Sequence, residues 1–390
     1  MVNLALVEPE LMAKSAHPAN TIPVFRPSIT EEEIRAVADV MRSGWLGLGP
    51  VTEEFENALA AEFEAGHVIA LNSGTAALHL AVLLLDLQPD DEVIVPTITF
   101  VSTAHAVRYA GAKVVFADVD KDTLCISVED VRRKITDKTK AIIPVHYGGH
   151  PCDMDALREL TAGKPITLIE DAAHACGASY KGKAIGAISP LTCFSFHAVK
   201  NLTCGEGGAV FTNNSEWARI LREMRWMGIS KDTYARTSHG EVYAWQYWVD
   251  ELGFKYHMHD ISAAIGLVQL RRLKENNRKR RRIMELYNRA FECHSWIETP
   301  VEYPHVHSSW HIYPIKISRR DELIAHLKRG GIAPGVHYYP IHLHPYYAAQ
   351  ESHCPIAEEV WKKVLSLPMF PDMTDAEISR VIEAVLSFEP

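Results

Sequence analysis

Short apolar strands alternate with helical segments through much of this 390-residue chain, and no other feature restricts its fold as strongly. The apolar runs span residues 67–71, 92–96, 113–119, 140–147, 166–173, 192–197 and 207–212. Strands that are apolar along their whole length are buried on both faces, as in sheets whose parallel strands are connected by helices. The sequence therefore predicts an α/β fold with a mostly parallel, seven-stranded sheet between helices.

The composition changes toward the C-terminus, where this alternation ends. We expect a large domain over residues 1–275, including the N-terminal segment, and a small α+β domain over 276–390. Residues 1–20 and 228–260 lack periodicity and are predicted to be a loose tail and a long loop region. Helices are expected to start near Asp260 and to close the chain at residues 375–388.

The net charge of −9 argues against nucleic acid or an anionic membrane surface as a partner. The basic run at 276–291 is therefore interpreted as the solvated face of an amphipathic helix. No apolar run reaches the roughly 18 residues of a membrane span, and the N-terminus lacks a basic signal region. The seven cysteines are widely separated and none forms a CxxC pair, so we expect a reduced, cytoplasmic protein.

Lys200 is the lone lysine of the segment CFSFHAVKNLTCGEGG, at residues 193–208. A lysine among apolar and hydroxyl neighbours loses its proton more easily and can act as an amine nucleophile toward carbonyls. The local sequence alone favours a lysine at a strand end that points to water. Other residues along the chain favour the first interpretation.

A phosphate site is indicated by SGTAAL, which places Ser73, Gly74 and Thr75 at a turn between a strand and a helix. Helix N-termini carry unpaired amides and positive partial charge, and glycine lets the backbone approach a phosphate closely. Serine and threonine are also ordinary helix caps, so this motif has a purely structural alternative.

Four further candidates follow strands or lie near their ends. Asp171 ends a strand, where α/β sheets bind ligands, and its carboxylate can pair with a protonated pyridine nitrogen. His174 follows one turn later and can reach the same ring. Ser195 can donate to a phosphate, and Phe100 can stack on an aromatic cofactor. A helix cap for Asp171 and core packing for His174 and Phe100 remain alternatives.

Taken in this order, these features resemble the fold type I pyridoxal-phosphate enzymes. More narrowly, the chain resembles the DegT/DnrJ/EryC1/StrS sugar aminotransferases over residues 22–388. The resemblance is carried by the segments SGWLGLGPVTEEFE, DEVIVPTITFVSTAHAV, IEDAAHACG, CFSFHAVKNLTCGEGGAV and HDISAAIGLVQL. Segments FSFHAVKN, PHVHSSWH and SLPMFPDMT look most like the branch that makes UDP-4-amino-4-deoxy-L-arabinose.

The resemblance implies that Lys200 holds pyridoxal phosphate, which passes through pyridoxamine phosphate, and that Asp171 keeps the ring nitrogen protonated. It further implies a homodimer with shared sites, glutamate as amino donor, 2-oxoglutarate as co-product, and a nucleotide-linked keto sugar aminated at C4. The phosphate would be held by Ser195, the 73–75 turn and a residue of the neighbouring subunit. The expected substrate-binding residues are Trp45, Leu46, His197, Asn201, His337, Tyr338 and His342.

The chain departs from the family pattern at two positions. Relatives place an asparagine for the neighbouring cofactor phosphate where this chain reads FKYH at 254–257, so Lys255 or His257 would replace it. Gly47 and Leu48 stand where relatives often carry two threonines near the sugar pocket. These departures leave the identity of the sugar open.

Other functions remain alternatives at this stage. Amination at C3 of a 3-keto sugar or of a keto-cyclitol would use the same residues. A pyridoxamine-dependent sugar dehydratase would carry histidine in place of Lys200. A non-enzymatic cofactor sensor would leave the site idle. The histidines at 337, 342 and 344 have no cysteine or acidic companion, so no metal site is expected.

Overall fold

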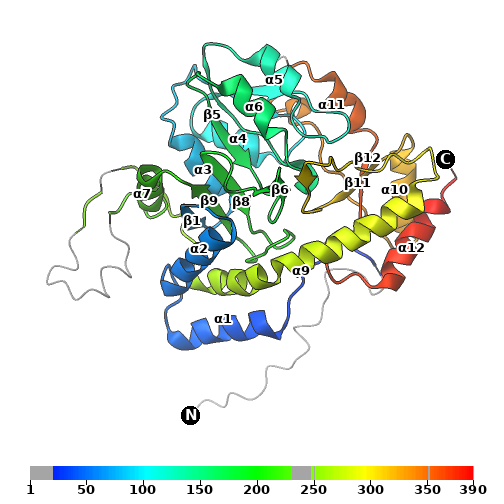
Figure 1. Ribbon diagram of the computed structural model, residues 1–390, viewed down its shortest axis with the longest axis horizontal. Helices are drawn as coiled ribbons and strands as arrows, with labels where there is room; N and C mark the ends of the chain where they lie inside the picture. The colour runs from blue at the N-terminus through cyan, green and yellow to red at the C-terminus, as the bar shows by residue number, and fades with distance from the viewer. Residues whose placement is uncertain (1–20, 231–246, 250, 350–351, 390) are drawn as a thin grey trace.

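The computed structural model describes residues 21–230, 247–249, 251–349 and 352–389 (Figure 1). The predicted N-terminal tail and residues 231–246 of the predicted loop lie outside these ranges. None of the helices in the described ranges combines the length and apolar character that a bilayer crossing requires.

Seven strands form the central sheet in the order β1-β9-β8-β5-β4-β2-β3. They are β1 (His67–Leu71), β2 (Glu92–Pro96), β3 (Lys113–Ala117), β4 (Thr139–Ile142), β5 (Thr167–Asp171), β8 (Leu191–Ser195) and β9 (Gly208–Thr212). Strands β8, β5, β4, β2 and β3 run parallel, whereas β9 is antiparallel to both of its neighbours. The predicted mostly parallel sheet is therefore confirmed.

Six helices flank the sheet, and their apolar side chains belong to the same hydrophobic core. They are α2 (Pro50–Glu62), α3 (Gly74–Leu83), α4 (Ser102–Tyr109), α5 (Val128–Lys134), α6 (Met154–Thr161) and α7 (Ser215–Met224). Ser73, Ser127, Asp153 and Asn214 cap α3, α5, α6 and α7, each accepting a hydrogen bond from an amide of the first turn. The residues that follow the strands thus start the next helix at a defined position.

Strand β4 is shorter than the sequence predicts. It ends at Ile142, although the apolar run continues to residue 147. Pro144 has no amide hydrogen to donate, and beyond it the chain pairs with β5 only through a bridge from Val145 to Asp171. The last helix, α12 (Asp375–Leu386), likewise ends before the predicted residue 388.

Four short strands were not predicted. The short strands β6 (Ser179–Tyr180), β7 (Lys183–Ala184) and β10 (Val306–His307) form a separate sheet. Strand β11 (Tyr313–Lys316) pairs with the unpredicted β12 (Val364–Leu367), and the helices α10 (Arg320–Arg329) and α12 lie in the same part of the molecule. A second hydrophobic core forms here, and Ile22 from the N-terminal segment belongs to it.

The helix α9 (Asp260–Phe291) joins the two cores (Figure 1). Its N-terminal part packs against α1 (Glu31–Ser43) and α2, and its C-terminal part contributes Ile283, Tyr287 and Phe291 to the second core. The two helical segments expected from the sequence are thus one helix of 32 residues. The domain boundary expected after residue 275 falls inside this helix.

The basic side chains of α9 form ion pairs and hydrogen bonds with other parts of the protein. Arg281 lies 2.8 Å from Glu302, Arg282 lies 2.8 Å from Asp375, and Lys274, just before the run, lies 2.9 Å from Glu62. Buried Arg280 donates to the carbonyl oxygens of His311 and Met369. The prediction of a solvated face holds for exposed Arg282 but is wrong for Arg280, which is buried and joins α9 to the C-terminal part of the chain.

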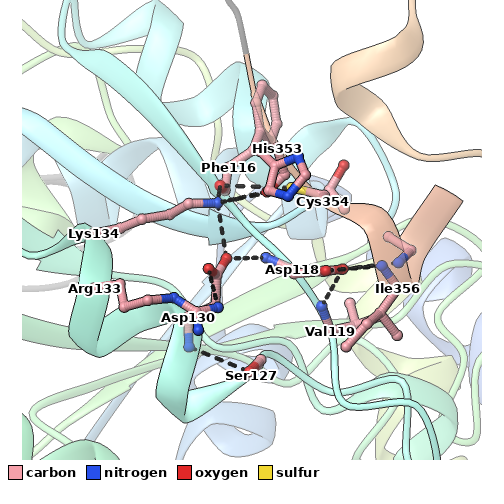
Figure 2. Close-up of polar contacts among 12 residues, drawn as sticks. Phe116, Asp118, Val119, Ser127, Asp130, Arg133, Lys134, His353, Cys354 and Ile356 are labelled. Atoms are coloured by element: carbon pink, nitrogen blue, oxygen red, sulfur yellow. Dashed lines mark hydrogen bonds and ion pairs between the residues drawn. The ribbon is translucent and has the colours of Figure 1, made fainter.

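Buried Asp118, just after β3, fastens a distant segment to the sheet (Figure 2). Its carboxylate accepts hydrogen bonds from the amides of Ile356 (2.9 Å) and Ala357 (2.8 Å), at the start of α11 (Pro355–Val360). The amide of Asp118 itself donates to buried Asp130, at 2.6 Å. Asp118 therefore supplies the cap that α11 lacks in its own sequence.

Lys134 strengthens the same attachment (Figure 2). Its ammonium group lies 2.8 Å from Asp130 and donates to the carbonyl oxygens of Phe116, at 2.7 Å, and His353, at 3.2 Å. One cation thus connects β3, α5 and the segment before α11. Because these partners are far apart in sequence, the attachment holds the C-terminal part against the sheet.

Replacing Asp118 with alanine should lower the free energy of unfolding by about 2–4 kcal/mol, because buried amides at α11 lose their acceptor. Denaturant unfolding followed by circular dichroism measures this change. Asp90→Ala is the control, since Asp90 pairs with Lys113 at the exposed surface and its loss should have a much smaller effect. Equal effects of the two substitutions would contradict the proposed role of Asp118.

Candidate functional site

The predicted site residues meet in one cavity at the carboxyl ends of the parallel strands. The cavity has a volume of about 470 Å³ and lies between the sheet and the C-terminal part of the chain. Eleven of the predicted residues line it: Ser73, Gly74, Thr75, Phe100, Asp171, His174, Ser195, His197, Lys200, His337 and Tyr338. Residues from five separate chain segments thus converge as expected for the edge of a parallel sheet.

Lys200 follows β8, and its amide donates to the carbonyl oxygen of His197, at 2.9 Å. The side chain is partly accessible from the cavity and otherwise enclosed by protein. This loss of hydration lowers the Lys200 pKa to about 8, while the negative charge of Asp171 opposes the shift. With this pKa, roughly a tenth of the amine is unprotonated at pH 7 and able to attack a carbonyl.

Asp171 ends β5 and is buried. Burial raises its pKa. The interactions that oppose this include a hydrogen bond from the Thr103 hydroxyl to Oδ2 (2.8 Å), one from the Ala173 amide to Oδ1 (3.1 Å), and the charge of Lys200. The carboxylate is held in a fixed orientation toward the cavity. It is suited to pair with the protonated nitrogen of a heteroaromatic ring.

An anion site is formed where α3 begins. Ser73 caps this helix, and its Oγ accepts from the amide of Ala76, at 3.1 Å. A side chain at Gly74 would place Cβ 2.8 Å from Cβ of Ser195, so only glycine lets the turn lie this close to β8. Together with the hydroxyls of Thr75 and Ser102, which lie 2.7 Å apart, this arrangement fits the phosphate of a cofactor.

Three histidines form one wall of the cavity. His174 lies in the loop after β5, and His311 and His337 belong to the C-terminal part of the chain. The rings of His174 and His311 have centroids 4.4 Å apart, and Phe25 stacks on His311 at 5.2 Å. Burial and the Lys200 cation lower the pKa of His337 to about 4 and hold the pKa values of His174 and His311 well below the usual range. The wall is therefore uncharged near neutral pH.

Two predicted substrate-binding residues do not line the cavity. Buried Asn201 donates to Asn277 (2.8 Å) and to the carbonyl oxygen of Ser309 (2.7 Å), which ties the Lys200 loop to α9. Buried His342 bonds Thr97 at 2.5 Å and lies 3.3 Å from a carboxylate oxygen of Glu358. Their assignment to the substrate pocket does not match these positions, because both side chains are used to join chain segments.

Four other predicted residues lie outside this cavity of the single protomer. Trp45 lines a separate groove beside α9, and Leu46 is exposed. The ammonium group of Lys255 lies 3.4 Å from the ring centroid of Trp226, and the His257 ring packs against the same indole at 4.4 Å. A role for these residues in a cofactor site therefore requires a second subunit.

Twelve residues that line the cavity were not predicted from the sequence. They are Phe25, Leu78, Thr99, Ser102, Thr103, Val145, Cys193, Phe194, Ala173, Val199, Glu206 and His311. The hydroxyl-rich run after β2 was a usable signal, because polar residues that follow a parallel strand face the ligand edge. Phe25 and His311 had no such signal, since their place in the cavity depends on how the C-terminal part packs. Among the described residues, no group of three or more side chains is arranged to hold a metal ion.

Comparison with known proteins places this geometry in context. The chain matches the DegT/DnrJ/EryC1/StrS aminotransferase family over residues 27–386. It is 43% identical over 375 residues to MJ1066 of Methanocaldococcus jannaschii, a protein described as uncharacterized, and this match covers 93% of the chain and 96% of the relative.

Solved structures agree with the sequence match. Spr1654 from Streptococcus pneumoniae, provisionally assigned as a sugar aminotransferase, has been solved in PLP and PMP forms. Its PMP form aligns with this chain with a TM-score of 0.88 at 33% identity. That alignment covers 93% of this chain and 98% of Spr1654. The sugar aminotransferase CalS13 from Micromonospora echinospora has a TM-score of 0.87 at 29% identity, over 94% of this chain and 100% of CalS13.

The cofactor-free protein should react with an amine-modifying reagent at Lys200 with a rate that rises through about pH 8, because the unprotonated amine is the reactive form. Asp171→Asn removes the charge that holds this pKa up, so the profile should move to lower pH. Mass spectrometry of the Lys200 peptide measures both profiles. Asp153→Asn, a change outside the cavity, is the control. A profile that rises near pH 10, typical of a hydrated lysine, would contradict the assignment.

Proposed function

Because the chain belongs to the DegT/DnrJ/EryC1/StrS aminotransferase family and is a pyridoxal-phosphate-dependent sugar aminotransferase, we propose that it transfers an amino group from glutamate to a nucleotide-linked keto sugar. The observation that carries this proposal is the placement of the Lys200 amine and the Asp171 carboxylate in one cavity. An amine with a pKa of about 8 beside a buried carboxylate is the pair that amino transfer through this cofactor requires.

When bound, pyridoxal phosphate supplies the electron sink that stabilises negative charge on the substrate carbon. Asp171 would keep the ring nitrogen protonated. Hydrogen bonds from Thr103 and Ala173 hold the Asp171 carboxylate in the orientation that this contact requires. Lys200 would hold the cofactor through its Nζ, and its free amine would take up a proton from the α-carbon of the donor. Because its pKa is close to neutral, the same nitrogen can also return that proton.

Ser195, Ser102 and the turn at 73–75 would hold the cofactor phosphate, since their hydroxyls and the α3 N-terminus face the same part of the cavity. The lining residues in the described chain include no arginine, and Lys200 is needed for chemistry. A homodimer would supply the missing charge through Lys255 of the partner subunit or His257 of the partner subunit. Lys255 is exposed and His257 is half-buried, and neither lines the cavity of its own protomer, which supports such sharing.

We further propose C4 of a 4-keto sugar as the position of amination. All three segments that resemble the UDP-4-amino-4-deoxy-L-arabinose branch reach the cavity wall: His197 and His311 line it, and Ser366 bonds the ring of His337 at 2.8 Å. Amination at C3 or of a keto-cyclitol is the second candidate, because the 43–50 loop departs from the family pattern. The widely separated cysteines favour a cytoplasmic location.

The purified holoenzyme should lose its absorbance near the visible range when glutamate is added, and should then aminate a keto sugar. A panel of UDP-, dTDP- and GDP-linked keto sugars, with product mass as readout, identifies the acceptor. Lys200→Ala should abolish both steps. Full transamination by Lys200→Ala would refute the role of this lysine, and a protein that never responds to any amino donor would refute the proposed function.

Subunit sharing can be tested by mixing two inactive variants. If Lys255 serves the neighbouring site, Lys200→Ala and Lys255→Met should each be impaired, and refolding them together should restore about a quarter of the wild-type rate, because only mixed dimers contain one intact site. The same mixture with His257→Gln identifies which residue acts across the interface. Lack of recovery in both mixtures would contradict sharing through this segment.

A further inference from the structure

His174 has a defined tautomer. Its Nδ1 accepts a hydrogen bond from the amide of Gly148, at 3.3 Å, so the lone pair is on Nδ1. Burial and the Lys200 charge keep the ring neutral, because they hold its pKa well below the usual range. The single ring proton is therefore on Nε2, the nitrogen that faces Tyr338.

This tautomer determines how Tyr338 can bond. Nε2 of His174 lies 3.1 Å from the Tyr338 hydroxyl oxygen. Because the ring N–H donates, the phenol oxygen accepts, and the phenol proton is free to bond elsewhere. Within the described ranges, the Tyr338 hydroxyl makes no hydrogen bond to a protein acceptor, and Tyr338 lines the cavity together with Asp171 and Lys200.

The segment that carries Tyr338 is fastened to the large domain on both sides. The Tyr147 hydroxyl donates to the carbonyl oxygen of His337, the residue before it. Further along the chain, the amide of Ile341 donates to the carbonyl oxygen of Thr97, at 2.8 Å, and Asp118 holds the start of α11 (Figure 2). The orientation of the phenol is therefore set by the protein and needs little adjustment when a ligand arrives.

We propose that the Tyr338 hydroxyl, aligned by His174, donates a hydrogen bond to the carbonyl oxygen of the substrate at the reacting carbon. A carbonyl oxygen has only lone pairs to offer, so it requires a donor of this kind. The phenol stays protonated, because burial and the charge of Asp171 raise its pKa. The inference rests on the proposed function, in which both the keto sugar and 2-oxoglutarate present a ketone in this cavity.

The test compares Tyr338→Phe with Tyr339→Phe in the holoenzyme. Tyr339 is the matched control, since it lies beside Tyr338 in sequence but packs against Trp361, with ring centroids 4.8 Å apart, and does not line the cavity. Calorimetric binding of 2-oxoglutarate to the pyridoxal form provides a readout without turnover, because that form holds no amino group to transfer. Tyr338→Phe should weaken this binding and lower kcat/KM for ketones about ten- to a hundred-fold, and Tyr339→Phe should leave both unchanged.

The role of His174 as a positioning residue is tested through a double-variant cycle. If His174 acts on ketones through Tyr338, adding His174→Met to Tyr338→Phe should weaken 2-oxoglutarate binding no further. His174→Gln, which retains an N–H donor, should preserve more binding than His174→Met. Additive losses would show that the two residues act separately and would overturn the proposed alignment.

The outcomes separate this inference from the proposed function. Wild-type binding of 2-oxoglutarate by Tyr338→Phe, with normal amino transfer, would refute the hydrogen bond and leave the aminotransferase assignment intact. A wild-type protein that fails to respond to glutamate would instead refute the function itself.

Discussion

The site depends on one electrostatic interaction, between a buried carboxylate and an amine that share a cavity. Burial disfavours the charged forms of both Asp171 and Lys200, and the charge of each group opposes the shift of the other. Thr103 and Ala173 add hydrogen bonds that stabilise the carboxylate. The result is a carboxyl group whose upward pKa shift is opposed, in the same cavity as an amine with a pKa of about 8.

The surroundings of this pair are consistent with its charge. A second cation next to Lys200 would be unfavourable in a partly dehydrated cavity, and the nearby histidines are accordingly neutral. A neutral imidazole has one donor and one acceptor nitrogen, so the bond from Gly148 to His174 decides which nitrogen faces the cavity. The Lys200 charge thereby influences which hydrogen bonds the wall of the cavity can offer.

The cavity is closed by parts of the chain that lie far from the sheet in sequence. Helix α9 joins the two cores as one continuous element, and its Arg280 fixes the carbonyl oxygen of His311 at the cavity wall. Asp118 and Lys134 hold the segment before and at α11 against the sheet, beyond the loop that contains Tyr338 (Figure 2). These long-range contacts explain how the C-terminal part can present side chains to the cavity in fixed positions.

The sequence by itself determined the sheet, because strands apolar along their whole length are stable only when both faces are covered. It also indicated that Lys200, Asp171, Ser195 and the 73–75 turn lie in one cavity, because residues that follow parallel strands meet at one edge of the sheet. Only the tertiary structure determined which residues form the opposite wall of the cavity. Phe25 and His311 reach the cavity, whereas His342 and Asn201 join chain segments, and local patterns carry no information about such distant packing.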